Sequence, residues 1–235
     1  MKTKIIKQKS QTIKSVLAEL KKQGSEYNRQ GMARFGINVQ KAFGVNVPIM
    51  RSIAKKIGKD HELAIKLWDS GNHEARHVAT MIADPKLTTK ALVNKWAKDF
   101  NSWDIVDGAC SNLLRKTDFA YELIPKWSKR KEEFVRRTAF SLIAYLAVHD
   151  KKRNDVEFLQ FLPLIKKYST DERNFVRKAV NWSLRQIGKR SFFLREEAVK
   201  CAEEIKAIDS KSARWIANDA LRELNNPKTY IRNNM

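Results

Sequence analysis

A tryptophan and an aspartate one helical turn apart form the pair in this sequence with the clearest potential for chemistry. In the stretch Ser102-Trp103-Asp104-Ile105-Val106-Asp107-Gly108-Ala109-Cys110, Trp103 and Asp107 lie four positions apart. A helix would therefore place an indole and a carboxylate on one face. A core-facing helix favours leucine at such positions, and a solvated face favours lysine or glutamate. The pair is either a helix start, with packing by Trp103 and an acid that offsets the helix dipole, or part of a functional site.

A second indole and two arginines extend this combination. Trp182 and Arg185 lie three positions apart, and Arg137 precedes them in a similar sequence context. If helices stack in register, these three residues become neighbours of Trp103 and Asp107. Such a set suits a substrate with a phosphate backbone, a flat or cationic body and a centre that becomes positive during reaction. DNA undergoing N-glycosidic cleavage has all three properties.

Each of these residues also has a structural interpretation. Trp182 is as readily explained by core packing as by a site, and Arg136 and Arg177 are expected to form structural ion pairs. The remaining tryptophans are predicted to pack in the core: Trp68, Trp96, Trp127 and Trp215. The choice between site and core therefore depends on the elements that carry the residues.

The elements that must position these side chains are predicted to be helices. Glycine and proline are scarce, at 8 and 5 residues, and Asn-Gly hairpin turns are absent. Ser25 is placed to cap a helix, and Pro48 lies in the first turn of another. Helices are predicted near residues 13–24, 25–36, 49–57, 62–69, 73–83, 88–98, 102–115, 119–129, 132–148, 156–168, 171–188, 192–207 and 211–225.

A repeat runs through this helical series. Residues 134–140 (FVRRTAF) resemble residues 175–181 (FVRKAVN), and weaker copies follow near residue 214 and precede near residue 76. Periods of about 40 residues with two helices each are typical of HEAT-like arrays. The sequence thus predicts an all-α fold of HEAT-like repeats in a curved superhelix with a basic concave face. No linker is evident, so residues 1–235 are expected to form one domain, with residues 1–36 as an N-terminal helical cap.

The charge balance indicates the class of partner. Lysine and arginine number 47 against 26 aspartates and glutamates, a net charge of +21. Such an excess favours nucleic acid as the partner, ahead of an anionic membrane surface or an acidic protein. The alternative is a host whose proteins are generally basic. No Gly-rich phosphate loop or nucleophile elbow occurs, so no nucleotide cofactor is expected.

The positions of the cysteines and histidines indicate whether a disulfide or a metal site is expected and which cellular compartment fits. Cys110 and Cys201 form no CxxC pair, and the histidines are scattered at positions 61, 73, 77 and 149. Neither a disulfide framework nor a metal site is expected, and a reducing cytoplasm fits. The basic stretch 1–9 lacks the apolar segment of a signal peptide, and no membrane span is expected.

A family resemblance rests on five segments in the same order as in that family. They are Phe43-Gly44-Val45 with Pro48 and Arg51, Trp103-Asp104 through Asp107, Ile124-Pro125-Lys126-Trp127, Arg137-Thr138-Ala139, and Lys178-Ala179-Val180-Asn181-Trp182-Ser183-Leu184-Arg185. The pattern resembles the AlkD-type alkylpurine DNA glycosylases, HEAT-like repeat proteins that excise positively charged N3- and N7-alkylated purines. Ser102 stands where relatives carry a second aromatic residue.

This resemblance implies roles for the residues above. Trp103 and Trp182 would hold the deoxyribose of the damaged nucleotide, Asp107 would be the catalytic carboxylate, and Arg137 would secure the DNA backbone. Arg185 is the second expected DNA contact. The expected partner is double-stranded DNA with alkylated purines, without a cofactor, a membrane or an obligate protein partner, and the protein is expected to be a monomer.

The resemblance also implies a mode of action. The base would not be enclosed in a flipping pocket, and the monofunctional reaction would leave an abasic site. Two alternatives stay open at this point. One is a non-catalytic binder of damaged, bent or branched DNA, and the other is a HEAT scaffold for an acidic protein partner.

Overall fold

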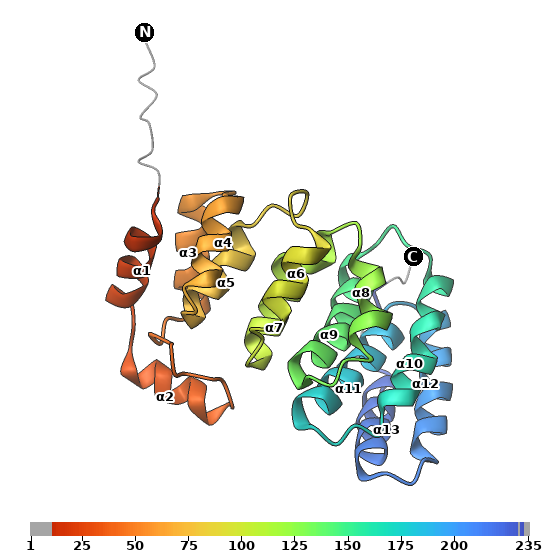
Figure 1. The fold of residues 1–235 in the computed structure, drawn as a ribbon. Coiled ribbons are helices and arrows are strands. Elements are labelled where there is room, and N and C mark those ends of the chain that lie inside the picture. The colour runs from red at the N-terminus through yellow and green to blue at the C-terminus, as the bar shows by residue number, and fades with distance from the viewer. Residues whose placement is uncertain (1–10, 230, 233–235) are drawn as a thin grey trace. The chain divides into compact units, whose positions relative to one another are not determined.

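The described part of the chain is entirely helical (Figure 1). A computed structural model describes residues 11–229, 231 and 232, so the basic stretch 1–9 lies outside it. Within this part there are α-helices and short 3-10 helices and no β-strand, which confirms the predicted all-α class. Among the same residues, no helix combines the length and apolarity needed to cross a bilayer.

The chain divides into two compact units where no linker was predicted. Unit 1 comprises Met1–Leu87 and unit 2 comprises Thr88–Met235. The N-terminal cap predicted for residues 1–36 falls within unit 1. A single functional domain with a basic concave face stays a prediction, and each unit is described by itself.

The described part of unit 1, from residue 11 on, contains five helices, each begun by a polar side chain that caps it. They are α1 (Ile13–Lys22), α2 (Glu26–Arg34), α3 (Val47–Ile57), α4 (His61–Asp69) and α5 (His73–Ile82). The side chains of Thr12, Ser25, Asn46, Asp60 and Asn72 accept the otherwise unpaired backbone N–H groups of the first turns. Ser25 and Pro48 thus act as predicted.

The Phe43-Gly44-Val45 segment is held by a buried carboxylate of α5. Glu74 is fully buried and accepts the backbone N–H groups of Phe43, Gly44 and Val45, with the Gly44 N to Oε1 distance at 2.7 Å. Gly44 has φ +80°, and a Cβ there would lie 2.1 Å from the carbonyl oxygen of Ser25. Glycine is therefore required by backbone geometry. Since the N–H of Ser25 also donates to the backbone oxygen of Phe43, the segment connects the start of α2 to α5.

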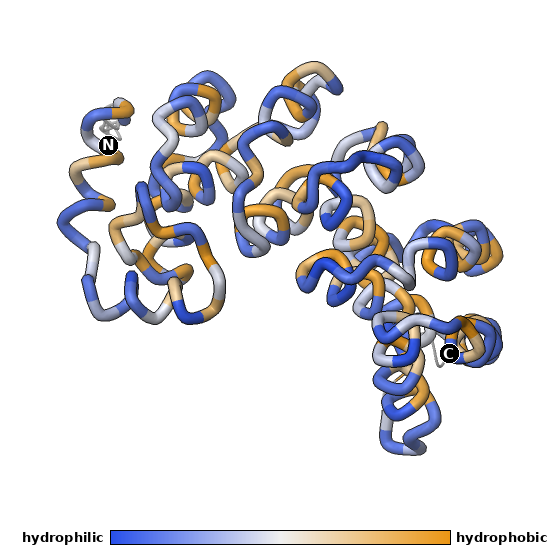
Figure 2. The backbone as a smooth tube through the Cα atoms, turned by 60° about the horizontal axis from the view of Figure 1, so that its bottom comes forward, coloured by the Kyte–Doolittle hydropathy of each residue, from blue (hydrophilic) through white to orange (hydrophobic). Residues whose placement is uncertain are grey.

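Unit 2 carries the repeat copies that begin near residues 134, 175 and 214, whereas the weak copy near residue 76 lies in α5 of unit 1. The elements of unit 2 are α6 (Lys90–Ala97), α7 (Trp103–Asn112), η1 (Leu114–Lys116), α8 (Ala120–Trp127), α9 (Glu133–His149), η2 (Asp155–Phe161), α10 (Leu162–Tyr168), α11 (Asn174–Gly188), α12 (Phe192–Lys206) and α13 (Lys211–Leu224). Helix α9 packs on α7, α8 and α11, and α11 packs on α12 and α13. Hydrophobic and hydrophilic stretches alternate along these helices (Figure 2), as helices buried on one side require.

The repeated segments occupy the first halves of neighbouring helices. Residues 134–140 begin α9 and residues 175–181 begin α11, and the rings of Phe134 and Phe175 lie 5.6 Å apart. The sequence repeat is therefore also a repeat in space, and α9 and α11 carry equivalent positions side by side.

Two predicted helices are interrupted. Residues 102–115 do not form one helix, because α7 ends at Asn112 and Leu113 adopts φ −125°, ψ −65°. The consecutive Leu113 and Leu114 at this bend are both in the core, at 0% and 2% exposure. Likewise 156–168 begins as the 3-10 helix η2, and the α-helix starts only at Leu162, with Pro163 in its first turn.

The tryptophans predicted to pack differ in outcome. Trp68, Trp96 and Trp127 are at most 2% exposed, which confirms core packing. Trp215 is 38% exposed, so the core assignment was wrong for this residue. The guanidinium of Arg177 lies 4.7 Å from its ring centroid, so a cation–π contact takes the place of burial.

Candidate functional site

The candidate site is built around the Asp107 carboxylate, where α7 faces α9. The Arg137 Nη2 atom donates to both carboxylate oxygens of Asp107, at 3.0 and 2.9 Å. Ser141, one turn further along α9, donates its hydroxyl to Oδ1 at 3.0 Å. The Asp107 side chain keeps 19% of its surface exposed. Two helices thus fix the carboxylate and leave part of it accessible.

Arg137 of α9 connects Asp107 on α7 to the backbone of α11. Its Nη1 donates to the backbone oxygen of Phe175 on α11 at 2.8 Å, and the residue is only 6% exposed. A contact from this guanidinium to a phosphate would require it to leave Asp107 or Phe175. The predicted backbone contact of Arg137 stays a prediction, and in this structure its place is that of a group that orients the carboxylate.

The electrostatics of Asp107 are dominated by its removal from water. Burial raises the pKa of Asp107 above its ordinary value, and the charge and hydrogen bonds of Arg137, with that of Ser141, offset only part of this rise. A carboxylate that is paired yet more basic than usual is suited to interact with a positive charge or to accept a proton.

Aromatic rings line the same region. Trp103 opens α7 and is half-buried, one turn before Asp107. Trp182 on α11 is also half-buried, and its ring meets Tyr145 of α9 edge to face, with centroids 5.0 Å apart. Burial and then the charge of Asp107 raise the pKa of Tyr145 to about 12, so the phenol stays protonated at neutral pH.

Three residues of the site were not predicted: Ser141, Tyr145 and His149. With Arg137 they recur every four positions along α9, which places them on one helix face. The rings of Tyr145 and His149 stack with centroids 6.1 Å apart. This spacing is visible in the sequence, and it could have identified the stripe once Arg137 was assigned to a site.

Arg185 lies apart from this stripe. Its guanidinium pairs with Asp219 at 2.9 Å and also with Glu223, both on α13. Trp182 instead turns its ring toward α9. The expected DNA contact of Arg185 stays a prediction, and in this structure its guanidinium has two acidic partners on the next helix.

A cluster of cations lies around His149 at the end of the stripe. Burial lowers the pKa of His149, and the charges of surrounding cations lower it further. These cations are Arg115, Arg232, Lys151 and Lys116. His149 follows Ser141 by eight residues of helix, about 12 Å. The face of α9 that carries Arg137 beside the Asp107 carboxylate at one end therefore carries His149, surrounded by cations, at the other end.

Histidines of unit 1 come closest to a metal-binding arrangement there. His73 and His77, one turn apart on α5, are buried with ring centroids 5.1 Å apart. This spacing suits two imidazole ligands, but two ligands alone do not define a site.

The stacked helix pairs define a HEAT-like repeat protein. A solved structure described as a new family related to the HEAT-like repeat DNA glycosylases, with affinity for branched DNA structures, superposes with a TM-score of 0.79. That match covers 96% of this chain and 99% of the other, at 24% identity. The likeness confirms the predicted fold.

The family follows from the sequence match. A family model described as DNA alkylation repair enzyme matches residues 16–224, so the chain belongs to the DNA alkylation repair enzyme family. Relatives include the uncharacterized proteins Lin0241 of Listeria innocua and Lmo0209 of Listeria monocytogenes. Each is 22% identical over 169 residues, which cover 71% of this chain and 73% of the relative.

Proposed function

We propose that this protein is a monofunctional DNA glycosylase that hydrolyses the N-glycosidic bond of N3- or N7-alkylated purines. The observation that supports this most is the partly exposed Asp107 carboxylate, held by Arg137 and Ser141 in the same unit as two half-buried indoles. Membership in the DNA alkylation repair enzyme family supports the same reaction class.

The chemistry required of the protein is modest. An alkylated purine carries a positive charge, so it leaves with the electrons of the C1′–N bond as a neutral base and needs no general acid. The deoxyribose becomes oxocarbenium-like, and Asp107 stabilises this charge and orients the attacking water. The raised pKa of Asp107 also suits it to take the proton that the water releases.

The indoles and the cations act on the rest of the substrate. Trp103 and Trp182 offer ring faces to the cationic sugar and exclude solvent from it. The cations around His149 attract the DNA backbone beyond the reacting nucleotide. Arg137 acts through Asp107, and Arg185 would exchange an acidic partner on α13 for a phosphate.

The setting of the reaction completes the proposal. The ligand is double-stranded DNA, the protein works as a monomer without a cofactor, and the base is not enclosed in a flipping pocket. A net charge of +21 supports a polyanionic ligand. The free, buried thiols of Cys110 and Cys201 fit a reducing cytoplasm.

The test is release of free base from duplex DNA that carries N7-methylguanine or N3-methyladenine. We expect release by the parent and almost none by Asp107→Asn, with similar affinity of both proteins for the duplex. Equal rates for the two proteins would remove Asp107 from the reaction and overturn the proposed mechanism.

A second candidate is a DNA binder without catalysis. It is favoured by the structural relative described as having affinity for branched DNA structures. Tight binding of a four-way junction, with preference over a matched duplex and no base release by the parent, would support it. Base release with equal affinity for junction and duplex would exclude it.

A further inference from the structure

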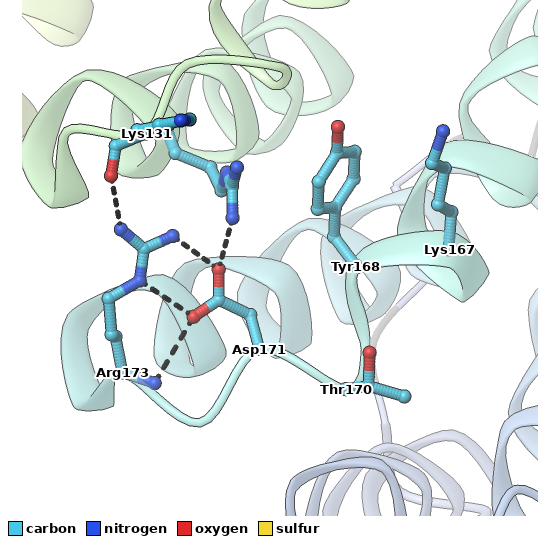
Figure 3. A pocket seen from close by; sticks show the side chains of 7 residues that line it. Lys131, Lys167, Tyr168, Thr170, Asp171 and Arg173 are labelled. Carbon is cyan, nitrogen blue, oxygen red and sulfur yellow. Dashed lines mark hydrogen bonds and ion pairs between the residues drawn. The ribbon is translucent and has the colours of Figure 1, made fainter.

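A hollow of about 460 Å³ lies on unit 2 outside the Asp107 site (Figure 3). It lies where the loops before α9 and α11 meet the end of α10. Four cationic residues line it, namely Lys131, Arg136, Lys167 and Arg173, against a single acidic one, Asp171. Its charge therefore favours an anionic ligand.

Part of this hollow is rigidly organised. Asp171, with a 6% exposed side chain, accepts from Arg136 Nη1 at 2.8 Å and from Arg173 Nε at 2.9 Å. Arg173 Nη1 also donates to the backbone oxygen of Lys131 at 2.6 Å, as Figure 3 shows. The two guanidinium groups are thus fixed before any ligand arrives, which reduces the entropy lost on binding.

The other polar groups of the hollow are uncommitted. Within the described residues, the ammonium groups of Lys131 and Lys167 make no ion pair, and the hydroxyls of Tyr168 and Thr170 make no hydrogen bond; Lys167 Nζ lies 5.8 Å from the Tyr168 ring centroid. The Tyr168 ring packs under the Arg136 guanidinium, 4.8 Å from centroid to Cζ. Figure 3 shows the Tyr168 hydroxyl and the Lys167 ammonium pointing the same way. Several donors are therefore available to one anion.

We propose that this hollow binds a backbone phosphate of nucleic acid, separately from the Asp107 site. The proposal rests on the proposed function for the identity of the polymer. A polymer is favoured over a small free anion because the lysines and Thr170 are exposed, so nothing encloses a small ligand. Arg and Lys donors around an anionic oxygen are the usual chemistry of phosphate recognition.

The hollow is also placed to act together with Asp107. Arg136 and Arg137 are consecutive on α9, so their side chains leave the helix about 100° apart. Arg137 reaches Asp107 of α7, and Arg136 reaches Ser128 and Asp171 on the other side. The proposal therefore requires that DNA bound at Asp107 extends past the start of α9 to the hollow.

The test uses the full chain with Lys131→Gln and Lys167→Gln combined. Its matched control carries Lys200→Gln and Lys206→Gln, two exposed lysines of α12 with the same loss of charge. Affinity for an unmodified duplex is measured by fluorescence anisotropy across a salt series. Base release is measured in single turnover at saturating protein.

We expect the hollow variant to bind about tenfold more weakly at low salt, with a salt slope reduced by about one to two phosphate contacts. The control and the maximal rate of base release should be close to the parent. Equal slopes for variant and control would overturn the proposal, as would a fall in maximal rate that matches the fall in affinity.

The two proposals fail in different ways. If the parent binds DNA but releases no base, and the hollow variant still loses affinity, the hollow site stands and the glycosylase is lost. If calorimetry shows that millimolar inorganic phosphate binds the parent but not the hollow variant, while both proteins bind DNA equally well, the hollow is a small-anion site, and the commitment to a polymer is overturned.

Discussion

Two carboxylates of unit 2 are bound by consecutive arginines of α9, and they differ in nearly every other respect. Asp171 receives hydrogen bonds from Arg136 and Arg173 and from a backbone N–H. Burial works to raise the pKa of Asp171, yet the hydrogen bonds from Arg173 and Arg136 bring it below its ordinary value. Asp107 has one guanidinium and one hydroxyl, and its pKa is raised by burial.

The difference lies in how completely each charge is compensated. Asp171 has a 6% exposed side chain and joins three segments, so its charge serves the structure. Asp107 is 19% exposed and retains basicity, so it keeps a capacity for an additional positive partner. An aspartate–arginine ion pair thus serves the structure at Asp171 and provides a candidate reactive group at Asp107.

The strongest way to break this comparison is to make the same change at both positions. Asp107→Asn should reduce the single-turnover rate of base release about 100- to 1,000-fold, since it removes the charge that stabilises the transition state. Asp171→Asn should leave that rate within about threefold of the parent, because the Asp171 carboxylate already pairs with Arg136 and Arg173. Single-turnover kinetics at saturating protein measures both, and similar losses would erase the distinction.

A second contrast uses the neighbouring arginines. Arg137→Lys keeps a positive charge but loses the paired donors, so the pKa of Asp107 should rise further. In the pH–rate profile of base release, activity is lost on the acid limb as Asp107 becomes protonated. This limb should move to higher pH. Arg136→Lys is the matched control and should leave the limb in place. A limb that moves equally in both variants would contradict a specific role for Arg137.

Stability should show the opposite order. Asp171→Asn should lower the free energy of unfolding by about 2 kcal/mol, since it leaves arginines without their buried partner. Asp107→Asn should change it by less than about 1 kcal/mol, because the raised pKa of Asp107 means that folding already disfavours its charge, whereas the lowered pKa of Asp171 means that folding stabilises the charge there. Urea unfolding measures both, and a larger loss at Asp107 would reverse the assignment.

The pH dependence of these losses follows from the directions of the pKa shifts. A lowered pKa makes Asp171 stabilising above the ordinary aspartate range, and this stabilisation is lost as pH falls through the folded-state value. A raised pKa makes Asp107 most favourable at low pH, and that contribution is lost as pH rises. The deficit of Asp171→Asn should therefore shrink in acid.

The smallest expected effect concerns Tyr145, which lies on α9 between Ser141 and His149. Tyr145→Phe keeps the edge-to-face contact with Trp182 and removes only the hydroxyl near Asp107. Base release should fall less than about fivefold, the equivalent of about one hydrogen bond. Tyr145→Ala should cost more, because Trp182 then loses a packing partner. Equal effects of the two changes would assign the role to the hydroxyl alone.

Much of the fold was predictable because helices are encoded locally. Capping residues such as Ser25, the scarcity of glycine, and the matching segments 134–140 and 175–181 predicted the elements and their pairing. The breaks at Leu113 and before Leu162 were not predicted, although Pro163 in the first turn of α10 is a local signal for the second break. Trp215 was misassigned because exposure depends on what packs over a residue.

The sequence by itself determined the helical repeats, the family and the candidates Trp103, Asp107, Arg137 and Trp182. Only the tertiary structure decided how these residues are used. It paired Arg137 with Asp107, turned Arg185 toward α13, and added Ser141, Tyr145 and His149 to the site. For the pairs of Arg137, Ser141 and Arg185, the physical reason is that the partner lies on the neighbouring helix, 30 or more residues away, where no local pattern records it.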